Sequence, residues 1–295
     1  MELNQIKQFR VIARTESISK ASEELFIAQP SLSQTLKRLE TELGTPLFDR
    51  KGRRIALNEA GRIFLKYCDK ITAALDSASR EINEYIGNTK SEINILFEST
   101  SFIILDIAEN MRKNYPWSLP HIYQRGCEDW DLKICSEICP DIGCPSRVII
   151  EEPIGVIMAK TNPLAAKSEV TKKDLEGLSF LSLNPADGLS VTVEHFCRTA
   201  GFHQNITMYV DSPTVMEELL LREFGVAFAP RYTWYGYYKD KLEYRAVSDM
   251  PMRHYIHLVM NESKYVTKEM QACYEAIAKY YMEYAREISR KCSDN

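Results

Sequence analysis

The segment AQPSLSQTLKRLETELG, residues 28–44, spaces leucines every three or four positions between a proline near its start and a glycine at its end. In a helical projection of about 100° per residue these leucines share one narrow sector. They are Leu32, Leu36, Leu39 and Leu43. Pro30 suits the first turn of a helix, where backbone amides have no intrahelical acceptor, and Gly44 suits the position just after the last turn. The spacing predicts a short helix that buries a single leucine face.

The opposite face of this helix is small, polar and rich in hydrogen-bonding groups. It carries Pro30, Gln34, Lys37, Arg38 and Thr41, with Ser31 and Ser33 at its flanks. A helix that reads DNA needs such a face, because its first turns enter a groove about 12 Å wide and meet donors and acceptors on base edges. The basic run RKGRR, residues 50–54, follows closely. Ordinary helical bundles and solvated turns show either feature alone, so only their combination points to DNA.

The rest of residues 1–86 is predicted to be helical apart from one hairpin. A first helix follows Leu3 through Ile12, and Ser19 is expected to cap a second. The segment FDRKGRRIAL, residues 48–57, predicts a hairpin with a glycine at its tip. Asn58 is expected to cap a long helix, after which GNTKS at 87–91 breaks the pattern and is expected to form a hinge.

After residue 91 the pattern changes to short apolar runs separated by helix-length segments. The runs are INILF, IGVIM, LSFLSL and VAFAP, and the helical segments lie at about 102–114, 188–200, 213–224 and 267–290. This alternation predicts an α/β domain with substantially parallel strands. The whole chain is therefore expected to be α+β, with an all-α domain first.

Composition excludes several classes of protein. The chain has 295 residues, a net charge of −4 and 45% hydrophobic residues, as ordinary globular proteins have. It shows neither an apolar run near the roughly 18 residues of a membrane span nor a signal-peptide core, so we expect a cytoplasmic protein. Its eight cysteines would then be mostly free thiols.

The sequence offers no coherent catalytic, cofactor or metal site. The segment GLSVT lacks the second glycine of a nucleophile elbow, and there is no glycine-rich phosphate loop. His254 and His257 should point to opposite faces of a strand and could not chelate one ion. A cysteine cluster, formed by Cys127, Cys135, Cys139 and Cys144, has spacings wider than structural zinc sites use. A thiol switch, a zinc site or plain cysteines remain open there. We expect neither an enzyme nor a cofactor or metal.

The stretch SISKASEELFIAQPSLSQTLKRLETELGTPLFDRKGRRIALNEAGRIFL, residues 17–65, resembles the winged helix-turn-helix of LysR-type transcriptional regulators. The resemblance implies a DNA-binding domain over 1–58 and a linker and dimerisation helix with hinge over 59–90. It implies contacts with double-stranded promoter DNA from Gln29, Pro30, Ser31, Ser33, Gln34, Lys37, Arg53 and Arg54. Ala28 departs from the serine or threonine usual in the family. An alanine cannot cap the helix, which should lower its stability by about 1 kcal/mol.

The remainder resembles, more loosely, the family's effector-binding domain, which is two-lobed like periplasmic solute-binding proteins. This implies one lobe over about 91–160 and 262–295 and another over about 161–261. A small-molecule effector, for which an anion is favoured, would bind between them. Candidate hydroxyl and amide groups follow two strands, at Ser99, Thr100, Ser101, Ser182 and Asn184. Helix capping is the simpler role for each. Residues 119–137 are too few for the helix that the family places there, so one pocket wall should differ.

The family resemblance also implies a homodimer through the long helix, and the family's common state is a tetramer. Three functions stay under comparison. They are a DNA-binding regulator that senses a small molecule, a solute-binding module without DNA function, and a metal-dependent or thiol enzyme. The N-terminal helices favour the first, and the steep salt dependence of phosphate contacts would separate it from the others.

Overall fold

A computed structural model describes residues 1–51, 54–87, 91–99, 103–115, 118–124, 126–127, 129–136, 146–235 and 240–293. The chain forms two compact units. The first unit consists of Met1–Gly87 with Ser263–Tyr265, and the second of Asn88–Glu262 with Val266–Asn295.

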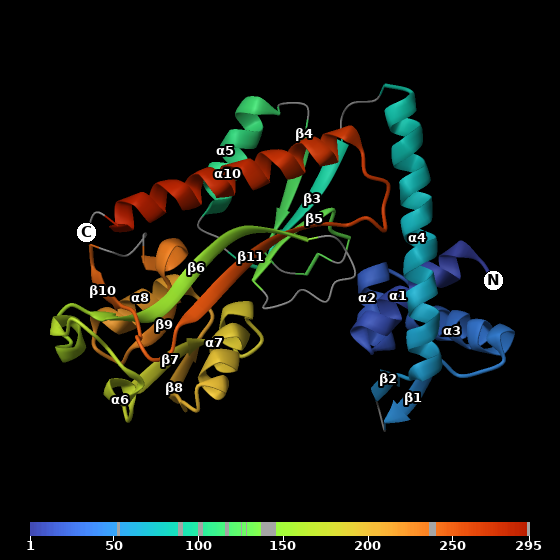
Figure 1. The fold of residues 1–295 in the computed structure, drawn as a ribbon. Coiled ribbons are helices and arrows are strands. Elements are labelled where there is room, and N and C mark those ends of the chain that lie inside the picture. Colours follow the sequence, from blue (N-terminus) through green and yellow to red (C-terminus); the bar gives the residue numbers. More distant parts are fainter. Residues whose placement is uncertain are drawn as a thin grey trace. The chain divides into compact units, whose positions relative to one another are not determined.

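The first unit is a helical domain with one hairpin (Figure 1). Its elements are α1 (Leu3–Thr15), α2 (Ile18–Leu25), α3 (Gln29–Leu43), β1 (Phe48–Lys51), β2 (Arg54–Leu57) and α4 (Glu59–Tyr85). The core includes Phe9 and Ile12 of α1 and Leu32 and Leu39 of α3, all at most 1% exposed. The ring of Phe64 meets that of Phe9 edge-on, with centroids 4.9 Å apart, and so joins α4 to this core.

The caps of these helices follow the predictions with one exception. The Asn58 side chain accepts a hydrogen bond from the Gly61 amide at 2.8 Å and caps α4 as predicted. The prediction that Ser19 caps α2 is wrong. Ser17 holds that position, in extended backbone, and its hydroxyl oxygen accepts from the Lys20 amide. Ser19 lies inside the helix and donates to the amide oxygen of Gln29 at 3.2 Å.

The predicted hairpin is present, with Phe48 opposite Leu57 and Lys51 opposite Arg54 in antiparallel register. Its tip at 52–53 lies outside the described residues. The start of α4 packs tightly against this hairpin at Gly61. A Cβ there would lie 2.2 Å from the carbonyl oxygen of Leu47, so only glycine allows this approach.

The second unit alternates strands and helices and includes two long strands. Its elements are β3 (Ser91–Phe97), α5 (Ile104–Asn114), β4 (Ser118–Tyr123), β5 (Leu132–Ser136), β6 (Ser146–Ala159), η2 (Pro163–Ala166), α6 (Lys172–Leu175), β7 (Ser179–Leu183), α7 (Gly188–Thr199), β8 (Asn205–Val210), α8 (Pro213–Leu221), β9 (Ala227–Pro230), η3 (Arg231–Tyr235), β10 (Leu242–Arg245), β11 (Met252–Met260) and α10 (Lys268–Ser293). α8 ends three residues earlier than predicted. The described residues between β4 and β5 form no helix, in line with the short segment noted in the sequence.

The main sheet is mixed rather than substantially parallel. Its order is β10-β6-β11-β5-β3-β4, with β9 also paired to β6, while β7 and β8 form a separate parallel pair. β3 is parallel to β4 and β5, but β6 pairs antiparallel with β9, β10 and β11. The chain leaves along β6 and returns along β11, so these neighbours must run in opposite directions. The apolar runs in the sequence do not indicate the relative direction of these strands.

Two hydrophobic cores share β6 and β11, the two long strands that run through the second unit in Figure 1. β6 gives Ile150 to a core packed under α5 and α10, and Ile154 to a core packed under α7. β11 gives Ile256 to the first core and Met252 to the second. The strands thus change from one core to the other near their middles. The α+β class with a two-lobed second part is confirmed. Among the helices that the structure describes, none has the length and apolarity to cross a membrane.

Candidate DNA-binding surface and effector domain

α3 presents the polar face predicted from the sequence. The three leucines Leu32, Leu36 and Leu39 are buried against α1 and its neighbours. The predicted DNA-contacting residues of α3 are all exposed; they are Gln29, Pro30, Ser31, Ser33, Gln34 and Lys37. Ala28 gives no side-chain cap, so the first-turn amides of α3 remain available to an external acceptor such as a phosphate.

The contacts around α3 fix its direction within the first unit. The Ser19–Gln29 hydrogen bond ties α2 to the start of α3. At the other end, the Glu40 carboxylate accepts from the Leu47 amide at 2.8 Å and holds the loop that leads into the hairpin. Of the two wing arginines, Arg53 lies outside the described residues, and Arg54 opens β2 opposite Lys51. Hydrogen bonds to neighbouring segments of the first unit therefore hold both ends of α3, and the hairpin follows it.

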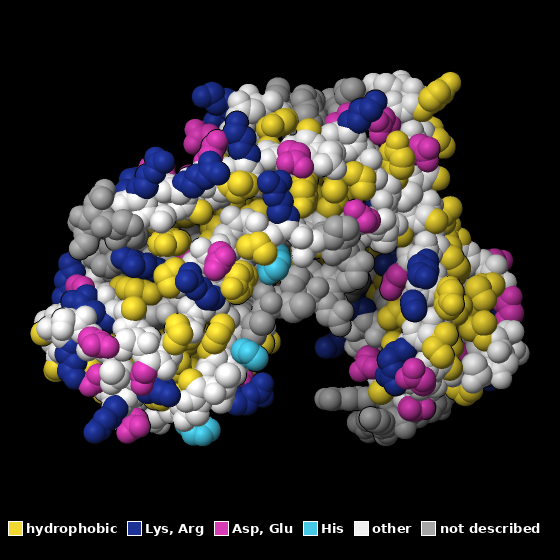
Figure 2. All heavy atoms as spheres, in the orientation of Figure 1, with side chains coloured by type: hydrophobic (Ala, Val, Ile, Leu, Met, Phe, Trp, Pro, Cys, Tyr) yellow, Lys and Arg dark blue, Asp and Glu magenta, His cyan; other side chains and the backbone are white. Residues whose placement is uncertain are grey.

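The long helix α4 carries an exposed apolar stripe, visible as hydrophobic side chains along it in Figure 2. The stripe consists of Ile63, Tyr67, Ile71, Leu75, Ile82 and Ile86, each 40–64% exposed. The other side of α4 packs into the unit through Cys68, where burial raises the pKa of the thiol to about 12. A stripe of this length on one helix is typical of a helix that pairs with another.

The predicted effector residues lie at strand ends in the second unit. Ser99 follows β3, while Thr100 and Ser101 lie outside the described residues. Ser182 lies on β7 with its hydroxyl 3.5 Å from that of Ser190. The Asn184 side-chain oxygen accepts from the Ala186 amide at 3.0 Å and forms a turn, whereas Asp187 rather than Asn184 caps the following helix α7. The cavity beside Ser182 measures about 20 Å³, little more than one water.

A buried polar network, which sequence reasoning missed, links both long strands. The hydroxyl of Ser136 lies 2.5 Å from Nε2 of His254, whose Nδ1 lies 3.1 Å from Oε1 of Glu152. The Glu152 carboxylate also accepts from the Thr233 hydroxyl at 2.7 Å and from the backbone amides of Tyr232 and Thr233 at 2.6 and 2.9 Å. A glutamate within an apolar strand was the available signal. The network joins β5, β6, β11 and η3.

The order serine, histidine, glutamate resembles a hydrolase triad, yet the surroundings do not favour catalysis. Ser136 is only 3% exposed. Gly188 presses on its backbone so closely that a Cβ there would lie 1.8 Å from the Ser136 carbonyl oxygen. A substrate carbonyl needs access to the nucleophile, so these contacts indicate a packing role instead.

The cysteine cluster is only partly described. Cys127 is half-buried, Cys135 is buried, and Cys139 and Cys144 lie outside the described residues. In the described part of the chain, no group of three histidine, cysteine or carboxylate side chains is placed to hold a metal ion. The alternatives for the cluster therefore remain those that the sequence left open.

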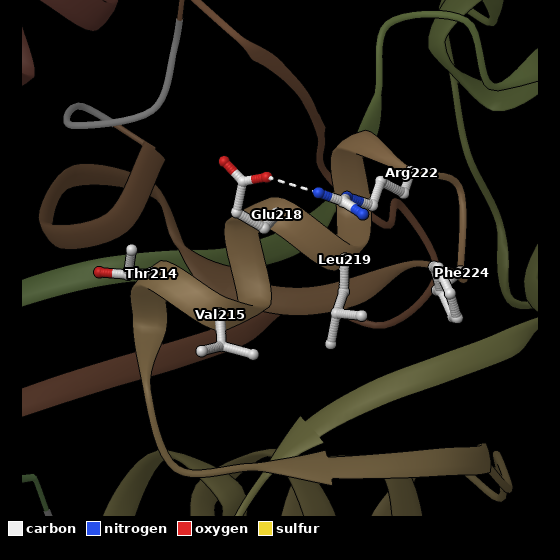
Figure 3. A pocket seen from close by; sticks show the side chains of 6 residues that line it. All are labelled: Thr214, Val215, Glu218, Leu219, Arg222 and Phe224. Carbon is white, nitrogen blue, oxygen red and sulfur yellow. Dashed lines mark ion pairs between the residues drawn. The ribbon is translucent and has the colours of Figure 1, made fainter.

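A shallow groove of about 240 Å³ lies on α8 (Figure 3). It is lined by Thr214, Val215, Glu218, Leu219, Arg222 and Phe224. Glu218 and Arg222 form an ion pair at 3.7 Å across its rim. None of the predicted effector residues lines this groove.

Comparison with known proteins identifies both parts of the chain. Residues 3–62 match the model of the bacterial regulatory helix-turn-helix protein, lysR family, and residues 126–281 match the LysR substrate binding domain. Among curated relatives, an uncharacterized HTH-type transcriptional regulator of Bacillus subtilis (strain 168), YybE, is 27% identical over 78% of this chain and 82% of its own length. The HTH-type transcriptional activator CmpR of Synechocystis sp. is 26% identical over 78% of this chain and 79% of its own.

Solved structures share the fold. A full-length OxyR variant from Pseudomonas aeruginosa has a TM-score of 0.65 at 17% identity, covering 95% of this chain and 94% of that one. The effector binding domain of QuiR, in complex with shikimate, has a TM-score of 0.56 at 16% identity, covering 66% of this chain and 98% of that one. With a helix-turn-helix model and an effector-domain model matched in series, the chain belongs to the LysR family of DNA-binding transcriptional regulators.

Proposed function

We propose that the exposed face of α3 and the hairpin arginines bind a promoter site in double-stranded DNA. The proposed contacts are Gln29, Pro30, Ser31, Ser33, Gln34, Lys37, Arg53 and Arg54. The observation that carries this proposal is the division of α3 into a buried leucine face and an exposed polar face with uncapped first-turn amides. The side chains suit distinct tasks: Gln34 can read base edges, while Lys37 and the arginines can neutralise phosphates.

The proposed domain scheme assigns 1–58 to DNA binding, 59–90 to the dimerisation helix and hinge, and 91–295 to effector binding. We propose that α4 pairs with the same helix of a second copy, because its apolar stripe offers a surface that water solvates poorly. Two DNA-binding domains would then read a pseudo-palindromic site, and a tetramer would pair two such dimers. The hinge itself falls largely at 88–90, outside the described residues.

For the second unit we propose an effector site between the lobes of about 91–160 with 262–295 and about 161–261. Ser99, Thr100, Ser101, Ser182 and Asn184 are its candidate contacts. Shikimate bound to the QuiR effector domain supports a small polar molecule as the class of ligand. Strand ends and the N-termini of the helices that follow favour an anionic group. Effector binding would change the lobe geometry and hence DNA binding or bending by the attached heads. We further propose a cytoplasmic location and no enzymatic activity.

A salt titration tests the DNA proposal. The intact protein is first used to select duplexes from its own genome, and Kd is then measured by fluorescence anisotropy at 50–300 mM salt. We expect a steep log–log slope, because bound phosphates release counterions. Lys37→Ala should weaken binding to every duplex and reduce the slope by about 1 for each lost phosphate contact. Gln34→Ala should instead reduce the difference in Kd between selected and random duplexes.

Thermal shift against a panel of carboxylate metabolites tests the effector site. Thr100→Val should abolish ligand-induced stabilisation and leave DNA binding intact. Stabilisation that persists in Thr100→Val would assign that residue to helix capping. A wild-type protein with no preference for any selected duplex would refute the DNA proposal as a whole.

A further inference from the structure

Phe26, in the turn between α2 and α3, is the most exposed large apolar side chain in the described chain, at 96%. Its backbone is also unusual, with φ 54° and ψ 39° in the left-handed region. The turn requires this conformation, because the Ile27 amide bonds back to the Ser22 carbonyl at 3.0 Å to close α2. Glycine adopts it with little strain because it has no Cβ, and asparagine is tolerated because its short polar side chain can hydrogen-bond locally; phenylalanine has neither property. The fold therefore accepts strain at a residue whose ring it does not bury.

Two other residues of the described chain share this strained backbone, and both have a partner within the fold. Glu16, with φ 44°, accepts a hydrogen bond from the Leu57 amide at 2.8 Å. Glu223, with φ 60°, accepts from the hydroxyl of Thr161. Their side chains explain why neither position is a glycine. At 96% exposure, the ring of Phe26 has no comparable packing to explain it.

The place of Phe26 indicates a use outside the fold. Two residues, Ile27 and Ala28, separate it from Gln29, and the Ser19–Gln29 hydrogen bond ties α2 to the start of α3. Phe26 is therefore close along the chain to the polar start of α3, the part proposed above to enter the major groove. Most of that groove is polar, but thymine presents a C5-methyl group there, and phenylalanine is one of the side chains that contacts it. The deoxyribose beside it offers a second apolar surface.

We propose that the ring of Phe26 packs on an apolar surface of the bound DNA, formed by a thymine methyl group or the adjoining deoxyribose. This inference rests on the proposed DNA binding by α3 and adds an apolar contact to it. The strain at residue 26 and the exposure of the ring are then retained for binding, as outlying backbone conformations at functional sites often are.

The test compares wild type, Phe26→Asn and Phe26→Tyr as intact proteins on a duplex that the wild type selects from its genome. Asparagine tolerates the left-handed backbone and removes the ring, whereas tyrosine keeps the ring. We expect Phe26→Asn to raise Kd about tenfold or more, with an unchanged salt slope, because no phosphate contact is lost. Its Tm should equal or exceed that of the wild type. Phe26→Tyr should bind within about twofold of the wild type.

A second experiment replaces the thymines of the duplex with uracil one at a time, and each replacement removes one methyl group. If the methyl is the partner, one position per half-site should weaken wild-type binding about fourfold and leave Phe26→Asn unaffected. If the sugar is the partner, Phe26→Asn loses affinity while no uracil position distinguishes the two proteins; this also supports the proposal. Phe26→Asn binding as tightly as wild type, or losing affinity together with a lowered Tm, would overturn it while the proposed function stands. Failure of the wild type itself to bind any duplex overturns both.

Discussion

Replacing Glu152 separates hydrogen-bond acceptance from charge in the buried network. The carboxylate is fully buried and accepts from the Thr233 hydroxyl and from the amides of Tyr232 and Thr233. Glu152→Ala leaves these three donors without that acceptor. Each unsatisfied buried donor costs about 1–3 kcal/mol of stability. Water that enters the space left by the glutamate side chain would recover part of this cost. We expect the free energy of unfolding of the second unit to fall by about 3–5 kcal/mol.

Glu152→Gln should lower the free energy of unfolding much less than Glu152→Ala. The amide oxygen can keep both backbone donors if the NH2 group turns toward the Thr233 hydroxyl and Nδ1 of His254. The hydroxyl can rotate to accept, and His254 can carry its proton on Nε2 and donate to Ser136. We expect a loss below about 1.5 kcal/mol. The neighbour Glu151 is the matched control: it is exposed and lies 3.7 Å from Arg253, so Glu151→Ala should cost less than about 1 kcal/mol.

Urea unfolding followed by tryptophan fluorescence measures these changes, because all three tryptophans, at 117, 130 and 234, belong to the second unit. With a slope near 2 kcal/mol/M, Glu152→Ala should lower the midpoint by about 2 M and Glu152→Gln by less than about 0.8 M. If Glu152→Ala lowers the midpoint no more than Glu151→Ala does, the three donors do not need the Glu152 carboxylate as their acceptor, and the reasoning is refuted. Equal losses for Ala and Gln would show that the charge, not hydrogen-bond acceptance, stabilises this junction.

Further outcomes follow from the first unit and from two of the cysteine thiols. Gly61→Ala should destabilise the first unit by about 1–3 kcal/mol, read as loss of helical circular dichroism, because its Cβ would overlap the Leu47 carbonyl oxygen; an unchanged transition would contradict this packing. Cys68, with its pKa raised by burial to about 12, should resist alkylation at pH 8.5 while half-buried Cys127 reacts, as peptide mass spectrometry would record. Burial favours the neutral Cys68 thiol in the folded state. Its contribution to the free energy of unfolding is therefore complete below pH 9 and is lost as the pH rises toward 12. Leu75→Glu should reduce the mass seen in sedimentation, since a charge in the exposed stripe opposes helix pairing; an unchanged mass would place the dimer contact elsewhere.

Periodicity and turn chemistry predicted most local features of the first unit. The leucine spacing predicted α3, and Gly44 ends it with φ 74°, as a residue after the last helical turn should. The cap of α2 was misplaced by two residues, because Ser17 and Ser19 both suit an N-cap and the apolar pattern shifts little between them. The left-handed Glu16 that ends α1 decides between them, since it leaves Ser17 extended and facing the Lys20 amide. That choice depends on a neighbouring helix rather than on α2.

The sequence predicted less of the second unit, because strand direction and the polar network depend on residues that are far apart along the chain. Apolar runs predicted where strands lie but not their direction, because β6 and β11 are each apolar whether they run parallel or antiparallel. The polar network unites Ser136, Glu152, Thr233 and His254 from four elements, so no local pattern contains it. His254 was predicted only to diverge from His257; its partners could not be inferred. Thr100 and Ser101, two of the candidate effector contacts, lie outside the described residues and stay a prediction.

The position of the polar network bears on how two lobes can share one sheet. Glu152 lies between Ile150, which belongs to one core, and Ile154, which belongs to the other; His254 lies between Met252 and Ile256 in the same way. An apolar pair at these two positions would extend one core into the other. A buried carboxylate instead needs specific partners in fixed directions, and its bonds to η3 and Ser136 favour one arrangement of the strands over its alternatives. The network therefore lies where β6 and β11 pass from one core to the other, and it keeps the two cores distinct there.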